Sequence, residues 1–400
     1  MTAPLIIRAE AIPVSLPLAR PVLMGGGQRF THSESLVVRL ETDSGLVGWG
    51  EASAAPTMTG ETLPGMKLVV DRVLLPMLDH APVLERATME RRLQRAIPGN
   101  SAAKCAVNVA LYDLLGRHYR VPVHALLGGL ARTRLPVMHL LANATVEEDL
   151  DEAVRKQAEG IRLFKVKAGV KPVADEIAML SALRERLGPE AMLCADANTG
   201  MGLDDACDYA RAAAGAGLLF FEQPLPDHDL DGMIKVAQAG GAPTCADESA
   251  HDIDHIIAWH RAGAIAGVNL KTIKLGGIAG LMRAAIVSGQ LGLKINLACK
   301  AGESSLGTAA LVHLGYTVPN RLGHHAEQPV PGRGHRARAD PAGGRDHSRT
   351  DRQRAGRRGG RGCGGSLPDG SLALPSRGAF VLTIHGPGPT LAASARRAPA

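Results

Sequence analysis

Three acidic residues are spaced as if each ended one unit of a repeating fold. Asp196, Glu222 and Asp247 each follow a short apolar run, at intervals of 26 and 25 residues. Such an interval is about one strand–helix unit, so the three carboxylates should meet where neighbouring parallel strands end. A single acid in such a place is more simply a helix cap. Three together, with no His or Cys among them, predict a site for a hard cation, Mg²⁺ or alternatively Mn²⁺.

Three lysines are predicted to lie at the same edge. Lys165 and Lys167 stand one residue apart in the apolar run "LFKVKAGV" (163–170), so in a strand they point to the same side. Lys271 ends a run four strands later and would face Lys167 across a ring of eight strands. Amines near a cation and near each other have a lowered pKa, towards that of a general base. Lys274, by contrast, is interpreted as a solvated surface amine.

This combination of groups predicts one kind of reaction. A cation beside a substrate carboxylate stabilises the negative charge that develops when a proton leaves the neighbouring carbon. The lysines can move that proton. The predicted activity is therefore metal-assisted proton abstraction α to a carboxylate.

The elements that must position these residues follow a regular rhythm. Short apolar runs alternate with segments of helical composition, and the runs that we predict as strands are 135–141, 163–167, 191–196, 217–222, 243–248, 267–271 and 294–298. Continuous apolar strands that alternate with helices indicate a parallel sheet covered on both faces. Seven such units favour an α/β fold of the (β/α) barrel class over a doubly wound sheet, and barrel active sites lie where the strands end.

The first 130 or so residues have a different organisation. Residues 35–53 predict a β-hairpin that turns at residues 43–45. A helix is predicted to begin near Ser101, with Ser101 itself as its N-cap residue. We therefore expect a mixed unit of strands and helices before the barrel.

The motifs in both parts resemble those of the enolase superfamily, in its muconate-lactonizing-enzyme (mandelate racemase/muconate cycloisomerase) subgroup. The resemblance spans about residues 5 to 328. It is carried by "GLVGWGEA" and "AAKCAVNVALYDLLGR" in the first part, and by "KVK", "DAN", "EQP", "ADES" and "NLKTIKLGGI" in the second. It implies a modified (β/α)7β TIM-type barrel over residues 131–330. An α+β capping domain over residues 1–130 would supply the loops that select the substrate.

The resemblance also implies a role for each candidate residue. The magnesium ligands would be Asp196, Glu222 and Asp247. Lys167 would be the base on one face of the substrate, with Lys165 lowering its pKa, and Lys271 would act on the other face. Three further residues would lie around the substrate and are our candidates for substrate binding: Glu303, Asn198 and Glu248.

The reaction implied by the resemblance is that of a Mg-dependent isomerase working through an enediolate-type intermediate. We lead with a muconate cycloisomerase-like reaction. The alternatives on the same scaffold are a racemase or epimerase of N-acylamino acids, dipeptides or hydroxy acids, and an o-succinylbenzoate synthase-like dehydratase. Gly323 and His325 stand where dipeptide epimerases of the superfamily carry an Asp-x-Asp pair, which disfavours a dipeptide substrate.

The last part of the chain does not continue the family pattern. Residues 331–400 contain 13 arginines and four aspartates but no lysine or glutamate, a net charge of +9; because the whole chain carries +6, residues 1–330 carry −3. Abundant Gly, Pro and Ala with one aromatic residue, Phe380, predict a low-complexity, disordered tail. Our hypothesis is that a frameshift replaced the authentic C-terminus near residue 330, which DNA sequencing across the junction tests. The non-enzymatic alternative is an Arg-rich tail that binds RNA or a protein partner.

Composition bounds the location and the partners. No uninterrupted apolar stretch is long enough for a membrane helix, and Arg8 and Glu10 interrupt the N-terminal apolar segment. The six cysteines form no C-x-x-C pair, which is typical of reduced thiols. We therefore expect a cytoplasmic homo-oligomer that acts on a small carboxylate substrate. The net negative charge of residues 1–330 argues against nucleic acid as a partner of this part of the chain.

Overall fold

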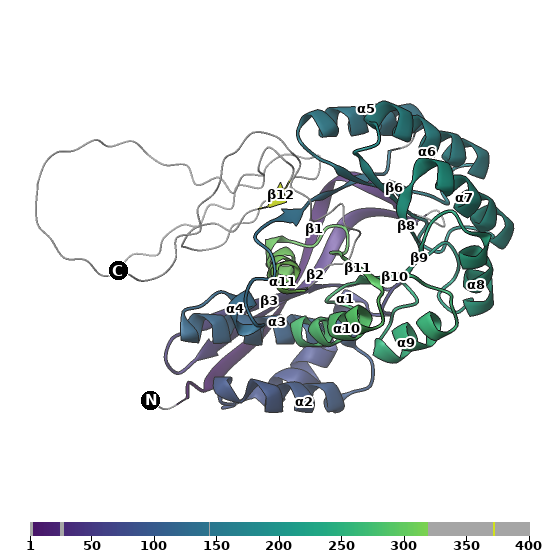
Figure 1. Ribbon diagram of the computed structural model, residues 1–400. Helices are drawn as coiled ribbons and strands as arrows, with labels where there is room; N and C mark the ends of the chain where they lie inside the picture. Colours follow the sequence, from purple (N-terminus) through teal and green to yellow (C-terminus); the bar gives the residue numbers. More distant parts are fainter. Residues whose placement is uncertain (1–2, 25–27, 144, 319–370, 373–400) are drawn as a thin grey trace, which may run out of the picture.

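The computed structural model describes residues 3–24, 28–143, 145–318 and 371–372. These residues form an N-terminal antiparallel sheet with its helices, and a larger parallel sheet with helices along its outer side (Figure 1). The predicted class is therefore confirmed: an α/β TIM-type barrel fold preceded by a capping domain. Gly323, His325 and nearly all of the tail lie outside the described residues.

The cap is built on a three-stranded antiparallel sheet. Its strands are β1 (Ile6–Met24), β2 (Gln28–Thr42) and β3 (Val47–Ser53), paired in that order. The predicted hairpin is confirmed, since β2 and β3 pair across a tight turn in which Gly45 has a φ of +79°. Helix α3 (Ser101–Tyr119) packs against this hairpin. A Cβ atom on Gly50 would lie 2.1 Å from the carbonyl oxygen of Ala106, so the close approach of helix and strand requires glycine there.

The helices of the cap include one long helix, α3, and several short ones. The others are α1 (Leu63–Val69), the π-helix η2 (Val70–Leu74), the 3₁₀ helices η3 (Leu75–Leu78) and η4 (Val83–Glu85), α2 (Arg86–Ala96) and α4 (Val123–Leu126). The predicted N-cap of α3 is wrong, because Ser101 is already helical and Asn100 holds the N-cap position without a side-chain capping bond. Instead, the Glu61 carboxylate accepts hydrogen bonds from the amides of Ala102 (2.7 Å) and Ala103 (2.9 Å). A distant residue therefore satisfies this helix end.

The described part of the barrel contains seven parallel strands, which match the seven predicted runs and pair in chain order. They are β5 (Met138–Leu141), β6 (Leu163–Lys167), β7 (Met192–Asp196), β8 (Leu218–Glu222), β9 (Thr244–Ala246), β10 (Gly267–Leu270) and β11 (Lys294–Leu297). The helices that follow them are α5 (Val146–Ala158), α6 (Val173–Leu187), α7 (Leu203–Ala216), α8 (Leu230–Ala239), α9 (Ile253–Arg261), α10 (Ile278–Gln290) and α11 (Ser305–Thr317). Figure 1 shows α5 to α9 as an arc outside the strands.

Strand register determines which side chains meet at the barrel mouth. Lys167 pairs with Asp196 of the next strand, and Asp196 pairs with Glu222 of the one after. These three residues therefore form one row across β6, β7 and β8. Within the described residues, β5 and β11 are the edges of this sheet. The short strand β4 (Leu135–Pro136) pairs instead with β12 (Ser371–Leu372) in antiparallel fashion.

Buried hydrogen bonds hold the cap on the barrel. The Glu51 carboxylate of β3 accepts bonds from the amides of Ser304 and Gly307 at the start of α11, each 3.0 Å long. The Ser33 hydroxyl donates to the carbonyl oxygen of Gly302 (2.6 Å). The cap sheet is thus fixed against the loop that follows β11, which is part of the barrel mouth.

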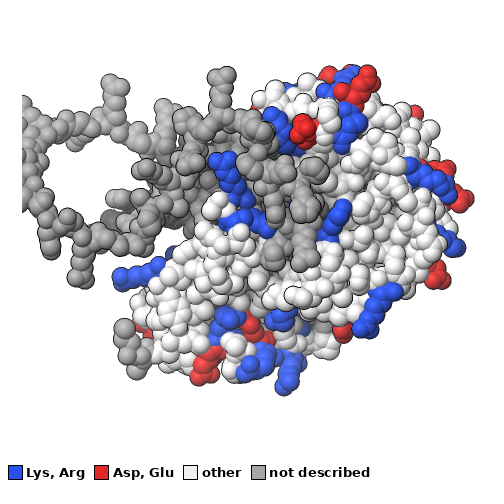
Figure 2. Space-filling view, viewed as in Figure 1, with Lys and Arg blue, Asp and Glu red and all other residues white. Residues whose placement is uncertain are grey.

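The described surface bears on the predicted partners. On the face shown in Figure 2, Lys, Arg, Asp and Glu side chains lie in scattered groups around a large uncharged area. The described part of that face therefore carries both signs of charge rather than one basic stripe. Among the described helices, none is both long enough and apolar enough to cross a membrane.

Candidate active site

The structure brings the six residues predicted to carry the chemistry together at the strand ends. They are Lys165 and Lys167 on β6, Asp196 on β7, Glu222 on β8, Asp247 directly after β9 and Lys271 directly after β10. None is more than 7% exposed. Charged groups this deeply buried need partners of opposite charge, and here they supply partners to one another.

Two lysines of β6 neutralise the carboxylates of the next two strands. The Lys165 Nζ lies 2.7 Å from Glu222 Oε2 and 3.4 Å from Asp196 Oδ2. The Lys167 Nζ lies 2.7 Å from the same Asp196 oxygen and also contacts the Asn198 side chain. Because both ammonium groups reach Asp196, the prediction that Lys165 and Lys167 point to the same side of the strand is confirmed.

Asp247 is held by two lysines from the segment after β10. Lys271 contacts its Oδ2 at 2.5 Å, and Lys274 contacts its Oδ1 at 2.7 Å. The interpretation of Lys274 as a solvated surface amine is therefore wrong, since its side chain is 1% exposed. The chain turns directly after β10 and returns the Lys274 Nζ to the carbonyl oxygen of Asn269, 2.9 Å away. The sequence of this segment does not show whether Lys274 turns back towards Asp247 or lies in a solvated loop.

The carboxylates and lysines shift one another's pKa values. Burial, and then Asp196, raise the pKa of Glu222 to about 7. Burial acts to raise the pKa of Asp247 too, but Lys271 and Lys274 hold it below its usual value. Burial alone would lower the pKa of Lys271, yet Asp247 and other carboxylates raise it above its usual value. The pKa of Lys165 is raised in the same way, because Glu222 and Asp196 outweigh the effect of burial. In this arrangement the pKa values of Lys165 and Lys271 are raised, because the ammonium group of each sits against carboxylates; the lowering expected beside a bound cation stays a prediction.

Two buried asparagines complete the network, and the sequence analysis missed them. The Asn269 side chain on β10 donates a hydrogen bond to Glu222 Oε1 (2.7 Å). The Asn296 side chain on β11 donates to Asn269 Oδ1 (3.2 Å). The signal available in the sequence was one Asn inside each of two predicted apolar strands. These bonds orient the Glu222 carboxylate, which faces Lys165 with its other oxygen.

Asn198 and Glu248 lie within the same site. The Asn198 side chain contacts Lys167 and donates a hydrogen bond to Glu248 Oε1 at 3.1 Å. Glu248 Oε2 is buried and has no hydrogen-bond partner among the described residues. Burial, followed by Asp247 and Asp196, raises the pKa of Glu248 to about 7.

Glu303 lies apart from the other candidates. It lines neither cavity described below, and its carboxylate accepts a hydrogen bond from the amide of Lys300 (3.2 Å). Burial, and then Glu51, raise its pKa to about 7. Glu303 is therefore part of the loop after β11, near enough to Glu51, the carboxylate that docks the cap, to be affected by its charge.

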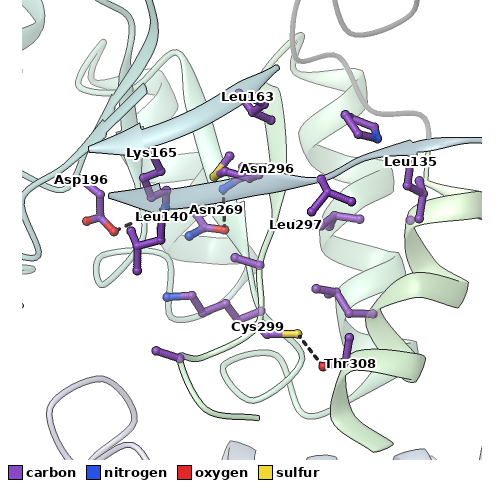
Figure 3. Close-up of a pocket in the computed structure, with 18 of the residues that line it drawn as sticks. Leu135, Leu140, Leu163, Lys165, Asp196, Asn269, Asn296, Leu297, Cys299 and Thr308 are labelled. Carbon is purple, nitrogen blue, oxygen red and sulfur yellow. Dashed lines mark hydrogen bonds and ion pairs between the residues drawn. The ribbon is translucent and has the colours of Figure 1, made fainter. Parts of the chain in front are cut away.

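Two cavities meet at the lysines. The larger, about 330 Å³, is lined by Lys165, Lys167, Lys271 and Asp196 together with apolar residues of β4, β5 and α11. Figure 3 shows Lys165 and Asp196 on one side of it, with Leu135 and Leu297 on the other. The smaller, about 60 Å³, shares Lys271 and Asn198 with the larger and reaches under the cap. A small molecule in these cavities would contact amines, amides and apolar side chains together.

The carboxylates are the groups that could hold a metal. Among the described residues, no three His, Cys, Asp or Glu side chains converge on a common point that could hold an ion. Instead, each of Asp196, Glu222 and Asp247 is drawn towards a lysine ammonium group. Carboxylate oxygens that could bind a metal ion are therefore present at neighbouring strand ends, and in this structure they face ammonium groups.

Comparison with known proteins covers both parts of the chain. The model of the mandelate racemase / muconate lactonizing enzyme N-terminal domain matches residues 6–128, and that of the enolase C-terminal domain-like region matches residues 148–344. The chain is 30% identical to L-Ala-D/L-Glu epimerase of Bacillus subtilis, over 79% of this chain and 86% of that protein. It is 29% identical to a chloromuconate cycloisomerase of Cupriavidus necator, over 78% of this chain and 86% of that protein.

Solved structures of similar proteins support the same relationship. The dipeptide epimerase of Enterococcus faecalis, complexed with Mg and the dipeptide L-Leu-L-Tyr, superposes with a TM-score of 0.74 at 26% identity, over 79% of this chain and 88% of that one. Both parts of the chain are thus matched by proteins named as epimerases and cycloisomerases. The chain belongs to the enolase superfamily, in the mandelate racemase/muconate lactonizing enzyme group.

Proposed function

We propose that the protein is a Mg²⁺-dependent isomerase that abstracts a proton α to a substrate carboxylate, in a muconate cycloisomerase-like reaction. The observation that carries the proposal is the buried cluster in which Lys165, Lys167 and Lys271 line one cavity beside strand-end carboxylates. The names of the matched relatives, cycloisomerase and epimerase, support the same reaction class.

The donor set fits a divalent cation. Burial, and then Asp196 and Asp247, raise the pKa of Glu222 to about 7 against the effect of Lys165, so positive charge among the carboxylates would be favourable. Glu248 adds a buried oxygen without a partner in the described part of the chain. Asp196, Glu222 and Asp247 would hold Mg²⁺ once their lysines release them. The bound cation would supply positive charge for the oxygens of an enediolate-type intermediate.

The lysines supply the proton chemistry. Lys167 and Lys271 reach the cavity from strand ends four positions apart, so a substrate between them would present its α-carbon to an amine on each face. Either amine, when neutral, can accept the α-proton, and the other can return a proton from the opposite face. Lys165, whose pKa is raised by Glu222 and Asp196 against the effect of burial, keeps its proton and offers positive charge to the substrate carboxylate.

An amine on each face also favours a second candidate, a racemase or epimerase of N-acylamino acids, dipeptides or hydroxy acids. The epimerases among the relatives support it. An o-succinylbenzoate synthase-like dehydratase uses the same groups, and a binding role for the Arg-rich tail stays the non-enzymatic alternative. The predicted homo-oligomer and cytoplasmic location stay predictions.

Proton NMR in D₂O tests the proposal. The full-length protein is incubated with muconates, N-acylamino acids, dipeptides and small hydroxy acids, with Mg²⁺ or with EDTA. We expect Mg²⁺-dependent solvent deuterium uptake or product formation with at least one compound. Uptake that is equal with Mg²⁺ and EDTA, or no uptake from a folded protein across the panel, would contradict the proposal.

A further inference from the structure

A small cavity of about 60 Å³ lies where the cap meets the barrel mouth. The cap contributes mostly apolar side chains to it: Leu18, Phe30, Ala55 and Met58. The barrel contributes two lysines, Lys271 and Lys300. Because Lys271 also lines the larger cavity, the small cavity continues the proposed reaction site beneath the cap.

Lys300 differs from the other lysines that line the two cavities. Lys165, Lys167 and Lys271 each pair with a carboxylate. Lys300 makes no ion pair with any residue that the structure describes, and its recorded contact is with the Phe30 ring, 5.5 Å from Nζ to the ring centre. Among the described lysines that line the two cavities, Lys300 is therefore the one whose ammonium group can pair with an anionic group of a ligand.

The surroundings of Lys300 favour an anion. The residue is half-buried, and burial lowers its pKa; Glu303 opposes that shift, Lys271 adds to it, and Glu34 opposes it more weakly. A partly desolvated ammonium group without a counter-ion is costly. An anionic group of a ligand beside its Nζ would remove that cost.

Glu248 lines the same cavity and is the group that would favour a cationic ligand instead. Its Oε1 already accepts a hydrogen bond from Asn198. Its other oxygen, Oε2, has no hydrogen-bond partner among the described residues and is the oxygen that the proposed function offers to Mg²⁺. Lys300 is therefore the group in this cavity that is left to bind a charge on the ligand.

We infer that Lys300 selects substrates that carry a second carboxylate, joined to the reacting carbon by a short apolar linker. The inference rests on the proposed function, which places the reacting carbon between Lys167 and Lys271. From there, the second carboxylate would reach Lys300, and the linker would pack on Phe30 and Met58. Muconates have this pattern, and N-succinylamino acids carry the second carboxylate on a linker that is apolar beyond its amide group, whereas N-acylamino acids with an apolar acyl group and simple hydroxy acids carry no second carboxylate.

Matched ligand pairs test the inference by isothermal titration calorimetry with Mg²⁺. N-succinyl-L-phenylalanine is compared with N-butanoyl-L-phenylalanine, and cis,cis-muconate with (2Z,4Z)-hexa-2,4-dienoate; in each pair a methyl group replaces the second carboxylate. The proteins are the full-length chain, Lys300→Met, Lys300→Arg and the control Lys235→Met, which removes an exposed lysine of α8. A charge-assisted hydrogen bond predicts a preference of about ten- to hundredfold in Kd for the dicarboxylate.

Lys300→Met should abolish this preference, while Lys300→Arg and Lys235→Met should keep it. A wild-type protein that binds both members of each pair equally, or neither member, would overturn the inference. So would a preference that survives in Lys300→Met. Because binding is measured separately from deuterium uptake, failure of the proposed function is distinguishable: it would appear as charge-dependent binding with no deuterium uptake.

Discussion

Replacing Lys274 by methionine should destabilise the barrel, although Lys274 lines neither cavity. The substitution removes the ion pair with Asp247 Oδ1 (2.7 Å) and the hydrogen bond to the Asn269 carbonyl oxygen (2.9 Å). Breaking a buried ion pair by removing one partner costs about 3–5 kcal/mol. Asp247 retains Lys271 as a partner, so we expect the lower end, about 3 kcal/mol, or roughly a hundredfold change in the unfolding equilibrium.

Urea unfolding followed by circular dichroism measures this effect. Lys235→Met, which removes an exposed lysine, should change the free energy of unfolding by less than about 0.5 kcal/mol. A double-mutant cycle with Asp247→Asn isolates the interaction, because Lys274→Met should cost markedly less once Asp247 has lost its charge. A Lys274→Met protein as stable as Lys235→Met, or a cycle with no coupling, would refute the account of a buried, paired Lys274.

Three further predictions concern the packing of cap and barrel. Glu51→Ala leaves the amides of Ser304 and Gly307 unpaired and should lower the free energy of unfolding by about 2–4 kcal/mol in urea; an effect below about 1 kcal/mol would contradict the docking role. Gly50→Ala should reduce the melting temperature measured by calorimetry, because its Cβ would overlap the α3 backbone; an unchanged value would show that helix and strand can separate freely. Burial, and then His124, lower the pKa of His313 from 6.5 to about 4, so its neutral form is favoured by folding. The contribution of neutral His313 to the free energy of unfolding should therefore be fully present above about pH 6.5 and be lost by up to about 1.4 kcal/mol per pH unit towards pH 4. His313→Gln should reduce this loss, and an identical pH profile of stability in the variant would disprove the prediction.

The strands and the chemistry-bearing residues could be predicted because their signals are local and periodic. Each barrel strand is a continuous apolar run, and the acids and lysines interrupt or end those runs at intervals of about one unit. Lys167, Asp196 and Glu222 consequently fall in one row of the sheet. Parallel pairing in chain order converts regular spacing in the sequence into contact in space.

The errors arose where a distant residue decides the outcome. Ser101 looked like a helix cap, but the amides it would serve are satisfied by Glu61, 40 residues earlier. Lys274 looked exposed, because nothing in its own segment shows that the chain turns it back towards Asp247. The directions in which the pKa values of Lys165 and Lys271 shift are likewise set by the balance between burial and several carboxylates, which lie on other strands. Such effects depend on the assembled site rather than on spacing along the chain.

We propose that Lys167 and Lys271 move protons on opposite faces of one α-carbon. Solvent deuterium uptake by proton NMR, on whichever substrate the wild-type protein exchanges with Mg²⁺, tests it most directly in Lys167→Ala and Lys271→Ala. Both variants should keep a native circular dichroism spectrum. For a substrate with two enantiomers, each variant should lose uptake from a different one; for a muconate, at least one variant should lose deuterium incorporation into the product. Uptake at the wild-type rate in both folded variants would contradict the account.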